Sequence, residues 1–407
     1  MIPMPYFWKQ LCRRKAMVAV TALSAVITCT LICGFHLGET SMSAQIGEVM
    51  DNLSVSCAVT NLTGTQEDGL DLPDWTVRLF LPVTADTRHI PETSFLDYLK
   101  EVRIKTSAKG EKDGQRITVY GVTTIAADRS IAPADERITW LDGYRDAVFE
   151  GEEPICLVSE DLYGTLSAEE TDTQEITVHI KGRRNANCIT ERTLRIAGVV
   201  SGQQQAVYCP FAVVADAVTE VSGSLTADSI SAVIKDNRRI DEFREKCAGV
   251  YFAEVDPRGI PQPWQASPLY ESYPFALAVY DETLRETINT LERGYNVFRT
   301  CRIAVIVLTA GLGLVTGILS VRRRQRELAL GNVMGCSRTG IFSEVFAGYG
   351  VVSVTGFAAA VTVFWIVFCA PPWSSIAAAL GAGGVGTALG ALPILINDDI
   401  LMMTGKE

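Results

Sequence analysis

The 407-residue sequence has few histidines and no excess of basic residues. Three histidines are too few for a histidine-built metal centre, and 36 Lys and Arg against 47 Asp and Glu give a net charge of −11. Nucleic-acid binding needs a basic face, so that class of protein is excluded. The 11 cysteines form no CxxC pair outside the apolar runs. This spacing excludes the usual zinc pattern and a dense disulfide framework.

The local motifs of catalysis are also missing. The sequence contains no GxxxxGK[ST], no HExxH and no GxSxG, and outside the apolar runs it contains no dinucleotide-binding GxGxxG. These motifs are the local signs of a phosphate loop, a zinc-protease helix, a hydrolase nucleophile and a dinucleotide turn. We therefore expect a non-catalytic chain with no cofactor and no metal of its own.

What the sequence does have is apolar residues gathered in four runs. Hydrophobic residues make up 48% of the chain, and the mean hydropathy is +0.19 despite the acidity. No Asp, Glu, Lys or Arg occurs in residues 16–37, 303–321, 345–369 and 375–396. At about 1.5 Å per residue, each run can cross a hydrocarbon core roughly 30 Å thick, which predicts four transmembrane helices. The first run exceeds the usual signal-peptide core of about 7–15 residues and is predicted to be a retained anchor.

The charges beside these runs predict their orientation. Basic clusters precede the first span and follow the second, so the positive-inside rule places residues 1–15, 322–344 and 397–407 in the cytoplasm. Residues 370–374 then form an external turn, and residues 38–302 form a large external domain. The cytoplasmic segments carry a net charge of +5, whereas the external domain carries −16.

The external segment mixes helix and strand patterns. β-Branched runs predict strands at Ser54–Thr60, Arg116–Thr124, Pro154–Val158, Ile176–Ile180, Leu194–Val200 and Ser229–Ile234. A helix is predicted over 239–250, and apolar residues at helical spacing around 46–53 and 284–298 predict a two-helix stalk. The predicted fold class is a membrane α-helical protein with four transmembrane helices. Its extracytoplasmic α/β (α+β) domain is inserted between helices 1 and 2 on a helical stalk.

Two glycine pairs lie inside the apolar runs. Gly313 with Gly317 and Gly386 with Gly390 both fit GxxxG, a spacing that lets membrane helices approach closely. Helix packing at these positions and incidental use of glycine in a membrane helix remain alternative interpretations.

The cytoplasmic loop reads RRRQRELALGNVMGCSRTGIFSE over residues 322–344. From position 326 its apolar residues can form one short helix on the membrane surface, ended by a glycine and followed by a serine cap. Such a helix suits contact with a cytoplasmic partner, whereas an ordinary basic loop would only fix topology. The residues predicted for partner contact are Arg326, Glu327, Leu330, Met334, Gly335, Ser337 and Arg338.

This loop resembles that of the FtsX/MacB superfamily of ABC-transporter permeases, where a (K/R)RRxRE(I/L)xxLRxxGxSRxxI signature joins the second and third spans. Gly331 and Asn332 stand where the signature has an arginine-containing pair. Ile138–Leu166, Leu194–Val200 and Val207–Val214 also resemble, in order, segments of the family's external MacB-type core domain. The loop positions that match the signature are Arg326, Glu327, Leu328, Gly335, Ser337, Arg338 and Ile341.

The resemblance implies a permease subunit in the cell membrane, with both termini cytoplasmic. A separate cytoplasmic ABC ATPase would bind ATP and dock on loop 322–344, and a second permease chain would pair with this one in the lipid bilayer as a homo- or heterodimer. Hydrolysis would move the external domain (mechanotransmission) to export or extract a peptide, antibiotic or lipoprotein. The alternative is a membrane-anchored sensor with an external α/β ligand-binding domain. A third interpretation, an ectoenzyme on a membrane anchor, is not supported, because the sequence shows no catalytic cluster.

Overall fold

The described part of the chain forms two compact units. The helical unit covers Met1–Glu48 and Thr287–Glu407, and the α/β unit covers Val49–Glu286. The predicted terminal segments 1–15 and 397–407 lie outside the described residues except for Lys15, as do residues 369 and 370. The computed structural model describes residues 15–81, 95–128, 131, 137–141, 143–169, 175–182, 188–202, 205–247, 252, 275–335, 337–368 and 371–396.

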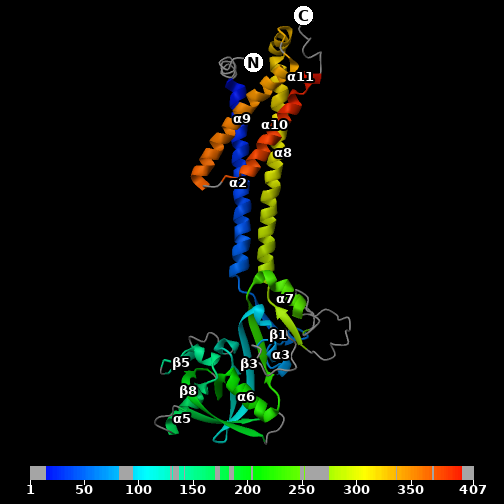
Figure 1. Cartoon of the computed structure of the whole chain (residues 1–407). Coiled ribbons are helices and arrows are strands. Elements are labelled where there is room, and N and C mark those ends of the chain that lie inside the picture. The colour runs from blue at the N-terminus through cyan, green and yellow to red at the C-terminus, as the bar shows by residue number, and fades with distance from the viewer. Residues whose placement is uncertain are drawn as a thin grey trace, which may run out of the picture. The chain divides into compact units, whose positions relative to one another are not determined.

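Four long helices dominate the helical unit (Figure 1). Each of them is long and apolar enough to cross a membrane, and together they contain the four predicted runs in the described residues. A fifth, short helix follows the last of them. The helices are α2 (Lys15–Asn52), α8 (Glu282–Val333), α9 (Arg338–Phe368), α10 (Trp373–Ala391) and α11 (Pro393–Ile396).

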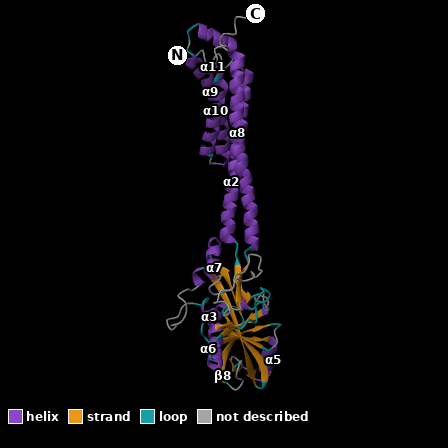
Figure 2. Ribbon diagram, turned by 90° about the vertical axis from the view of Figure 1, so that its right-hand side faces the viewer, coloured by secondary structure: helices purple, strands orange, loops and turns teal. Residues whose placement is uncertain are grey.

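Helices α2 and α8 lie side by side beyond their most apolar stretches (Figures 1 and 2). Phe298 packs on Gly38, where an added Cβ atom would lie 2.8 Å from its ring. Beside it, Arg302 Nη1 and Glu39 Oε2 form an ion pair of 2.6 Å. These contacts belong to the helical unit. The α/β unit therefore contains fewer residues than the predicted external segment 38–302.

The chain reverses direction twice after α8. The turn between α8 and α9, the first turns of α2, and α11 all lie at one end of the helical unit (Figures 1 and 2). Four arginines of the sequence RRRQR occupy the last turns of α8 at this end.

One ten-stranded sheet forms the framework of the α/β unit. Its order is β12-β1-β11-β3-β4-β9-β6-β8-β5, with β7 paired to β3 and β8. Most pairs are antiparallel, while β4–β9 and β6–β8 are parallel. The strands are β1 (Ser56–Asn61), β3 (Leu99–Lys112), β4 (Gln115–Val122), β5 (Ile138–Trp140), β6 (Ile155–Ser159), β7 (Glu175–Lys181), β8 (Ile189–Val200), β9 (Ala206–Pro210), β11 (Ser229–Ile234) and β12 (Phe275–Val279).

Short elements flank this sheet. A second sheet pairs β2 (Leu72–Pro73) with β10 (Thr226–Ala227). The helices are α3 (Asp74–Arg78), α5 (Glu160–Glu169), α6 (Phe211–Ser222) and α7 (Ile240–Cys247), and the 3₁₀ turns are η1 (Phe95–Asp97), η2 (Ile125–Ala127), η3 (Asp146–Glu150) and η4 (Asn237–Arg239).

Helix α6 packs closely on one face of the sheet at Gly121 of β4, which has no side chain to block its approach. A Cβ atom on Gly121 of β4 would lie 2.6 Å from Cβ of Val214, so glycine is needed at this crossing. Val214, Ala217 and Val218 of α6 are buried in the same hydrophobic cluster as Val119 of β4. A second cluster, around Tyr208 and Phe149, fills the opposite face.

All six predicted strands are present, most within two residues of the predicted ends, although β8 begins five residues earlier than expected. The mixed α/β fold of this unit is therefore confirmed. Strand β3, the longest, was missed. Its sequence LKEVRIKTSAKGEK places charged residues at most outward positions and weak hydrophobes at several inward ones, so the alternation typical of a half-buried strand is obscured.

Candidate functional site

The turn between α8 and α9 is built by a glycine and a serine. Gly335 has a φ of +87°, which a residue with a side chain rarely adopts, and it ends α8 two residues after Val333. Ser337 Oγ accepts a hydrogen bond from the backbone N–H of Gly340 at 3.2 Å, the usual contact of a helix N-cap. Helix α9 then begins at Arg338.

The prediction of a separate short surface helix beginning at position 326 is wrong. Helix α8 runs without a break from Glu282 to Val333 and includes this stretch. Residues 322–330 are Arg, Gln, Glu, Leu and Ala, all strong helix formers, and no proline interrupts them. A helix that has already crossed an apolar run therefore continues through them.

The end of α8 presents an exposed apolar patch formed by Leu330, Val333 and Met334, called here the terminal apolar patch. Their exposed fractions are 62%, 82% and 78%. Leu328 and Ala329, the two residues before Leu330, are buried. Leu328 belongs to a hydrophobic cluster with α9 and α11, which fixes the side of α8 that faces inward.

Charged residues precede the patch by one helical turn. Arg326 and Glu327 are exposed and lie four and three residues before Leu330, on the same side of α8. Arg324 Nη1 and Glu344 Oε1 lie 3.8 Å apart and link α8 to α9. The structure thus brings Arg326, Glu327, Leu330 and Met334 onto one surface. Gly335, Ser337 and Arg338 form the turn and the start of α9.

The four predicted packing glycines lie where α8 crosses α10. A Cβ atom on Gly317 would lie 2.6 Å from the carbonyl oxygen of Thr387 and 3.1 Å from Cα of Gly390. Gly313 meets the backbone of Gly383 in the same way, and Gly386 meets the backbone of α8 at Ala310 and Leu314. The two helix backbones touch at this crossing, and Gly383, which the GxxxG pattern did not select, also takes part.

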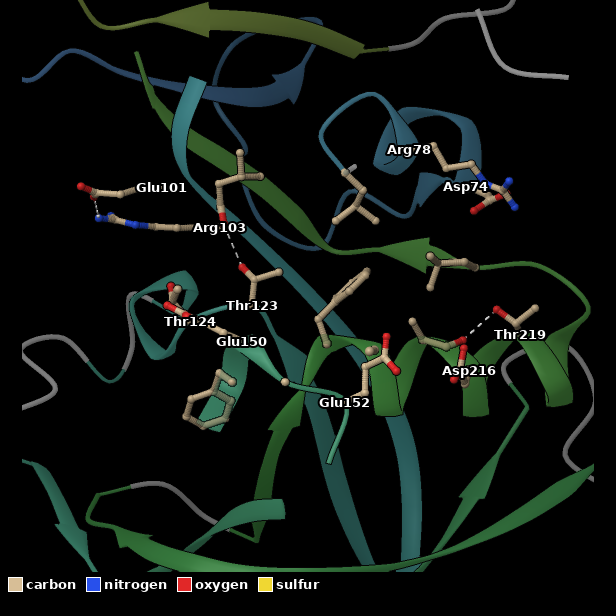
Figure 3. Close-up of a pocket in the computed structure, with 18 of the residues that line it drawn as sticks. Asp74, Arg78, Glu101, Arg103, Thr123, Thr124, Glu150, Glu152, Asp216 and Thr219 are labelled. Atoms are coloured by element: carbon tan, nitrogen blue, oxygen red, sulfur yellow. Dashed lines mark hydrogen bonds and ion pairs between the residues drawn. The ribbon is translucent and has the colours of Figure 1, made fainter. Parts of the chain in front are cut away.

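A groove of about 1300 Å³ opens in the α/β unit (Figure 3). Helix α3, the start of β3, the segment around η3 and one side of α6 line it. At its edge β3 contains a β-bulge, since its register with β11 shifts between Ser231 and Val233. Glu101 in this bulge has a positive φ of 52°. Bulges bend a strand and redirect its side chains, as Glu101 is here redirected beside the groove.

The lining of the groove carries an excess of negative charge. Both of its guanidinium groups are already paired: Arg78 Nη2 with Asp74 Oδ2 at 2.7 Å, and Arg103 Nη2 with Glu101 Oε2 at 3.2 Å. The remaining carboxylates give the lining a formal charge of −4. The carboxylates that line the groove are Asp74, Glu101, Asp146, Glu150, Glu152 and Asp216.

A buried lysine stands in the same unit. Burial alone lowers the pKa of Lys105, but its hydrogen bond with Asp68 and the charges of Asp128 and Asp228 outweigh burial and raise the pKa. Its Nζ atom lies 3.7 Å from Asp128. Lys105 therefore stays protonated and acts as the cation of a buried ion network.

Among the described residues, no group of three or more His, Cys, Asp or Glu is placed to hold a metal ion.

Comparison with known proteins gives distant structural similarities only. No protein-family model and no curated protein matches the sequence. The periplasmic region of MacB from Actinobacillus actinomycetemcomitans is 15% identical, covers 60% of this chain and 95% of its own, and gives a TM-score of 0.29. The extracellular domain of the ABC-type transporter YknZ from Gram-positive bacteria is 13% identical, with coverages of 46% and 88% and a TM-score of 0.28. At these values the similarities carry no argument about function.

Sequence reasoning missed the groove. Its walls come from segments between Asp74 and Leu225 that are far apart in the chain, and each contributes only one or a few residues. No local motif marks such a surface.

Proposed function

We propose that this chain is the membrane subunit of an ABC transporter of the FtsX/MacB type. The observation that carries the proposal is the end of α8. There a basic, exposed helix end bears an apolar patch and is followed by a Gly-x-Ser-Arg turn that resembles the family's coupling signature.

The proposed topology has four spans, with the α8–α9 turn in the cytoplasm and the α/β unit outside. Four helices of sufficient length and hydropathy support it. The arrangement of their ends supports it too, because the start of α2, the α8–α9 turn and α11 share one end of the helical unit. The arginines of α8 gather at that end, as the positive-inside rule expects for the cytoplasmic side.

The partner at the terminal apolar patch is proposed to be a cytoplasmic ATP-binding subunit. An exposed apolar cluster beside charged residues is typical of a protein interface, where a few buried side chains provide most of the binding energy. This chain lacks a phosphate loop, so we assign nucleotide binding to the partner. A second permease chain completes the proposed complex.

Helix α8 supplies the proposed mechanical link. Its 52 residues span about 78 Å at about 1.5 Å per residue, and it has no break between the terminal apolar patch and Glu282. A displacement of its end by the ATP-binding subunit is therefore passed along a single stiff element.

We propose that the acidic groove receives the cargo, and that its charge favours a cationic peptide segment.

Reconstitution tests this proposal. The full chain is purified alone, and also with the ATP-binding subunit encoded beside it. We expect no ATP hydrolysis by the chain alone and hydrolysis by the complex, abolished when the partner's phosphate-loop lysine is replaced. Hydrolysis by the chain alone would overturn the proposal. Failure of any ATP-binding subunit to co-purify would instead favour the sensor alternative.

A further inference from the structure

Two cysteines of the α/β unit, Cys156 and Cys209, lie on neighbouring strands, and both are buried free thiols in this structure. Strands β6 and β9 are antiparallel, with Leu157 opposite Tyr208 and Val158 opposite Val207. In an antiparallel ladder each step forward on one strand is a step back on the other. The next pair in this register is therefore Cys156 of β6 and Cys209 of β9.

Both cysteine side chains lie on the same face of the sheet. Cys156 and Cys209 are buried in the hydrophobic cluster under α6, together with Val158 and Val207, two positions away on each strand. The residues between them face the opposite cluster. Side chains alternate between the faces of a sheet, so both thiols lie on the α6 side. A register shift next to Cys156 concerns only the pairing of β6 with β8 and leaves the β6–β9 register intact.

Directly opposite residues of an antiparallel pair have Cα atoms about 4.5–5.5 Å apart. Disulfides join residues whose Cα atoms lie about 4.4–6.8 Å apart. We propose that Cys156 and Cys209 are joined by a disulfide bond, formed while the α/β unit folds outside the membrane. This inference rests on the proposed topology, because disulfides form and persist in oxidising extracytoplasmic compartments.

The bond needs an oxidant, and its chemical class is a disulfide donor such as an oxidoreductase disulfide or oxidised glutathione. The thiolate of one cysteine attacks a sulfur of the donor, forms a mixed disulfide and releases one donor thiolate. The second cysteine displaces the other donor sulfur. In total the two cysteines lose two protons and two electrons, and the donor becomes two thiols.

This exchange must precede burial. Burial raises the pKa of both thiols, that of Cys156 with a further contribution from Cys209, so neither forms a thiolate readily in the folded unit. A bond formed during folding is afterwards shielded from reductants by the cluster under α6.

The disulfide would fix two walls of the groove. Cys156 lies four residues after Glu152, and Cys209 lies two residues before Phe211, the first residue of α6. Glu152 and Phe211 both line the groove. The crosslink would thus hold the segment before β6 and the start of α6 at a constant separation. Its expected role is to keep the groove in shape while α8 moves.

Peptide mapping of the full chain in native membranes tests the proposal. Free thiols are alkylated under denaturing, non-reducing conditions before trypsin digestion. Cys156 and Cys209 fall in separate tryptic peptides, residues 146–181 and 196–235, and neither peptide contains another cysteine. We expect these peptides to be linked and to separate on reduction. In the Cys209→Ala variant, the peptide with Cys156 should be alkylated instead.

Stability gives a second measurement. The disulfide would close the loop from Cys156 to Cys209. For a loop of this length, we expect reduction to lower the unfolding temperature of the wild-type chain by roughly 10 °C. Reduction should leave the unfolding temperature of Cys209→Ala unchanged. If this variant fails to fold, peptide mapping of the wild type still decides the question.

Labelling of the exposed Cys188 distinguishes a failure of the disulfide proposal from a failure of the topology on which it rests. If a membrane-impermeant maleimide labels Cys188 on intact cells while Cys156 and Cys209 are both alkylated, the disulfide proposal is overturned and the topology stands. If Cys188 is labelled only after permeabilisation, the topology fails. Refolding the purified full chain with oxidised and reduced glutathione then decides: linked peptides support the pairing, and free thiols refute it.

Discussion

Replacing Leu330 and Met334 together by aspartate removes the exposed apolar surface on which the ATP-binding subunit is proposed to dock. Full burial of a Leu or Met side chain contributes about 1.5–3 kcal/mol. Leu330 is 62% and Met334 78% exposed, so only these fractions remain to be buried by a partner. Scaled in this way, the two side chains contribute about 2–4 kcal/mol, a roughly 30- to 1,000-fold change in Kd.

Co-purification with the ATP-binding subunit measures this loss. The Leu330→Asp, Met334→Asp variant should still insert into the membrane, because both side chains are exposed and no charge is buried. Val297→Asp is the matched control, since Val297 lies on the same helix and is 60% exposed. It should leave the yield of complex unchanged.

Exposed charges should contribute less. Arg326→Ala is expected to weaken the complex by about 0.2–1 kcal/mol, and more at low salt than at high salt. Wild-type yield of complex from the double aspartate variant would refute the docking argument and place the contact elsewhere on the chain.

Two predictions concern stability. Gly390→Val forces a side chain against α8, where an added Cβ atom already lies 3.1 Å from Gly317, and should lower the stability of the helical unit by about 1–3 kcal/mol. Gly34→Val, with no atom within 4 Å of the added Cβ, should leave the thermal aggregation midpoint in detergent unchanged. Hydrogen bonds from Arg239 and Tyr98 lower the pKa of Glu242 to about 2, so its stabilising effect is present above its unfolded pKa of about 4.5 and is lost as pH falls towards 2. Glu242→Gln should flatten that part of the unfolding-midpoint curve, and an unchanged slope would contradict this assignment.

The helices of this protein were predictable because apolar and charged residues are segregated along the chain. Charge-free runs of about 20 residues can only be buried or placed in lipid, so their positions follow from composition alone. The paired extensions of α2 and α8 followed from apolar residues repeating at helical spacing. The continuation of α8 up to its end was not predicted. A glycine followed by a serine marks a helix end, but it does not show whether an earlier helix has already ended before it. The strong helix formers at 322–330 carried α8 through the predicted break.

The strands with β-branched runs were equally local in origin, and the fold class of the α/β unit followed from them. The sequence determined which side chains are apolar, where the charges lie and which residues can end a helix. Only the tertiary structure decided which distant segments meet. The groove, the contact of Gly313 with Gly383, and the opposition of Cys156 and Cys209 all depend on sheet order, strand register or helix crossing. Those are set by packing between residues tens of positions apart, and no local pattern encodes them.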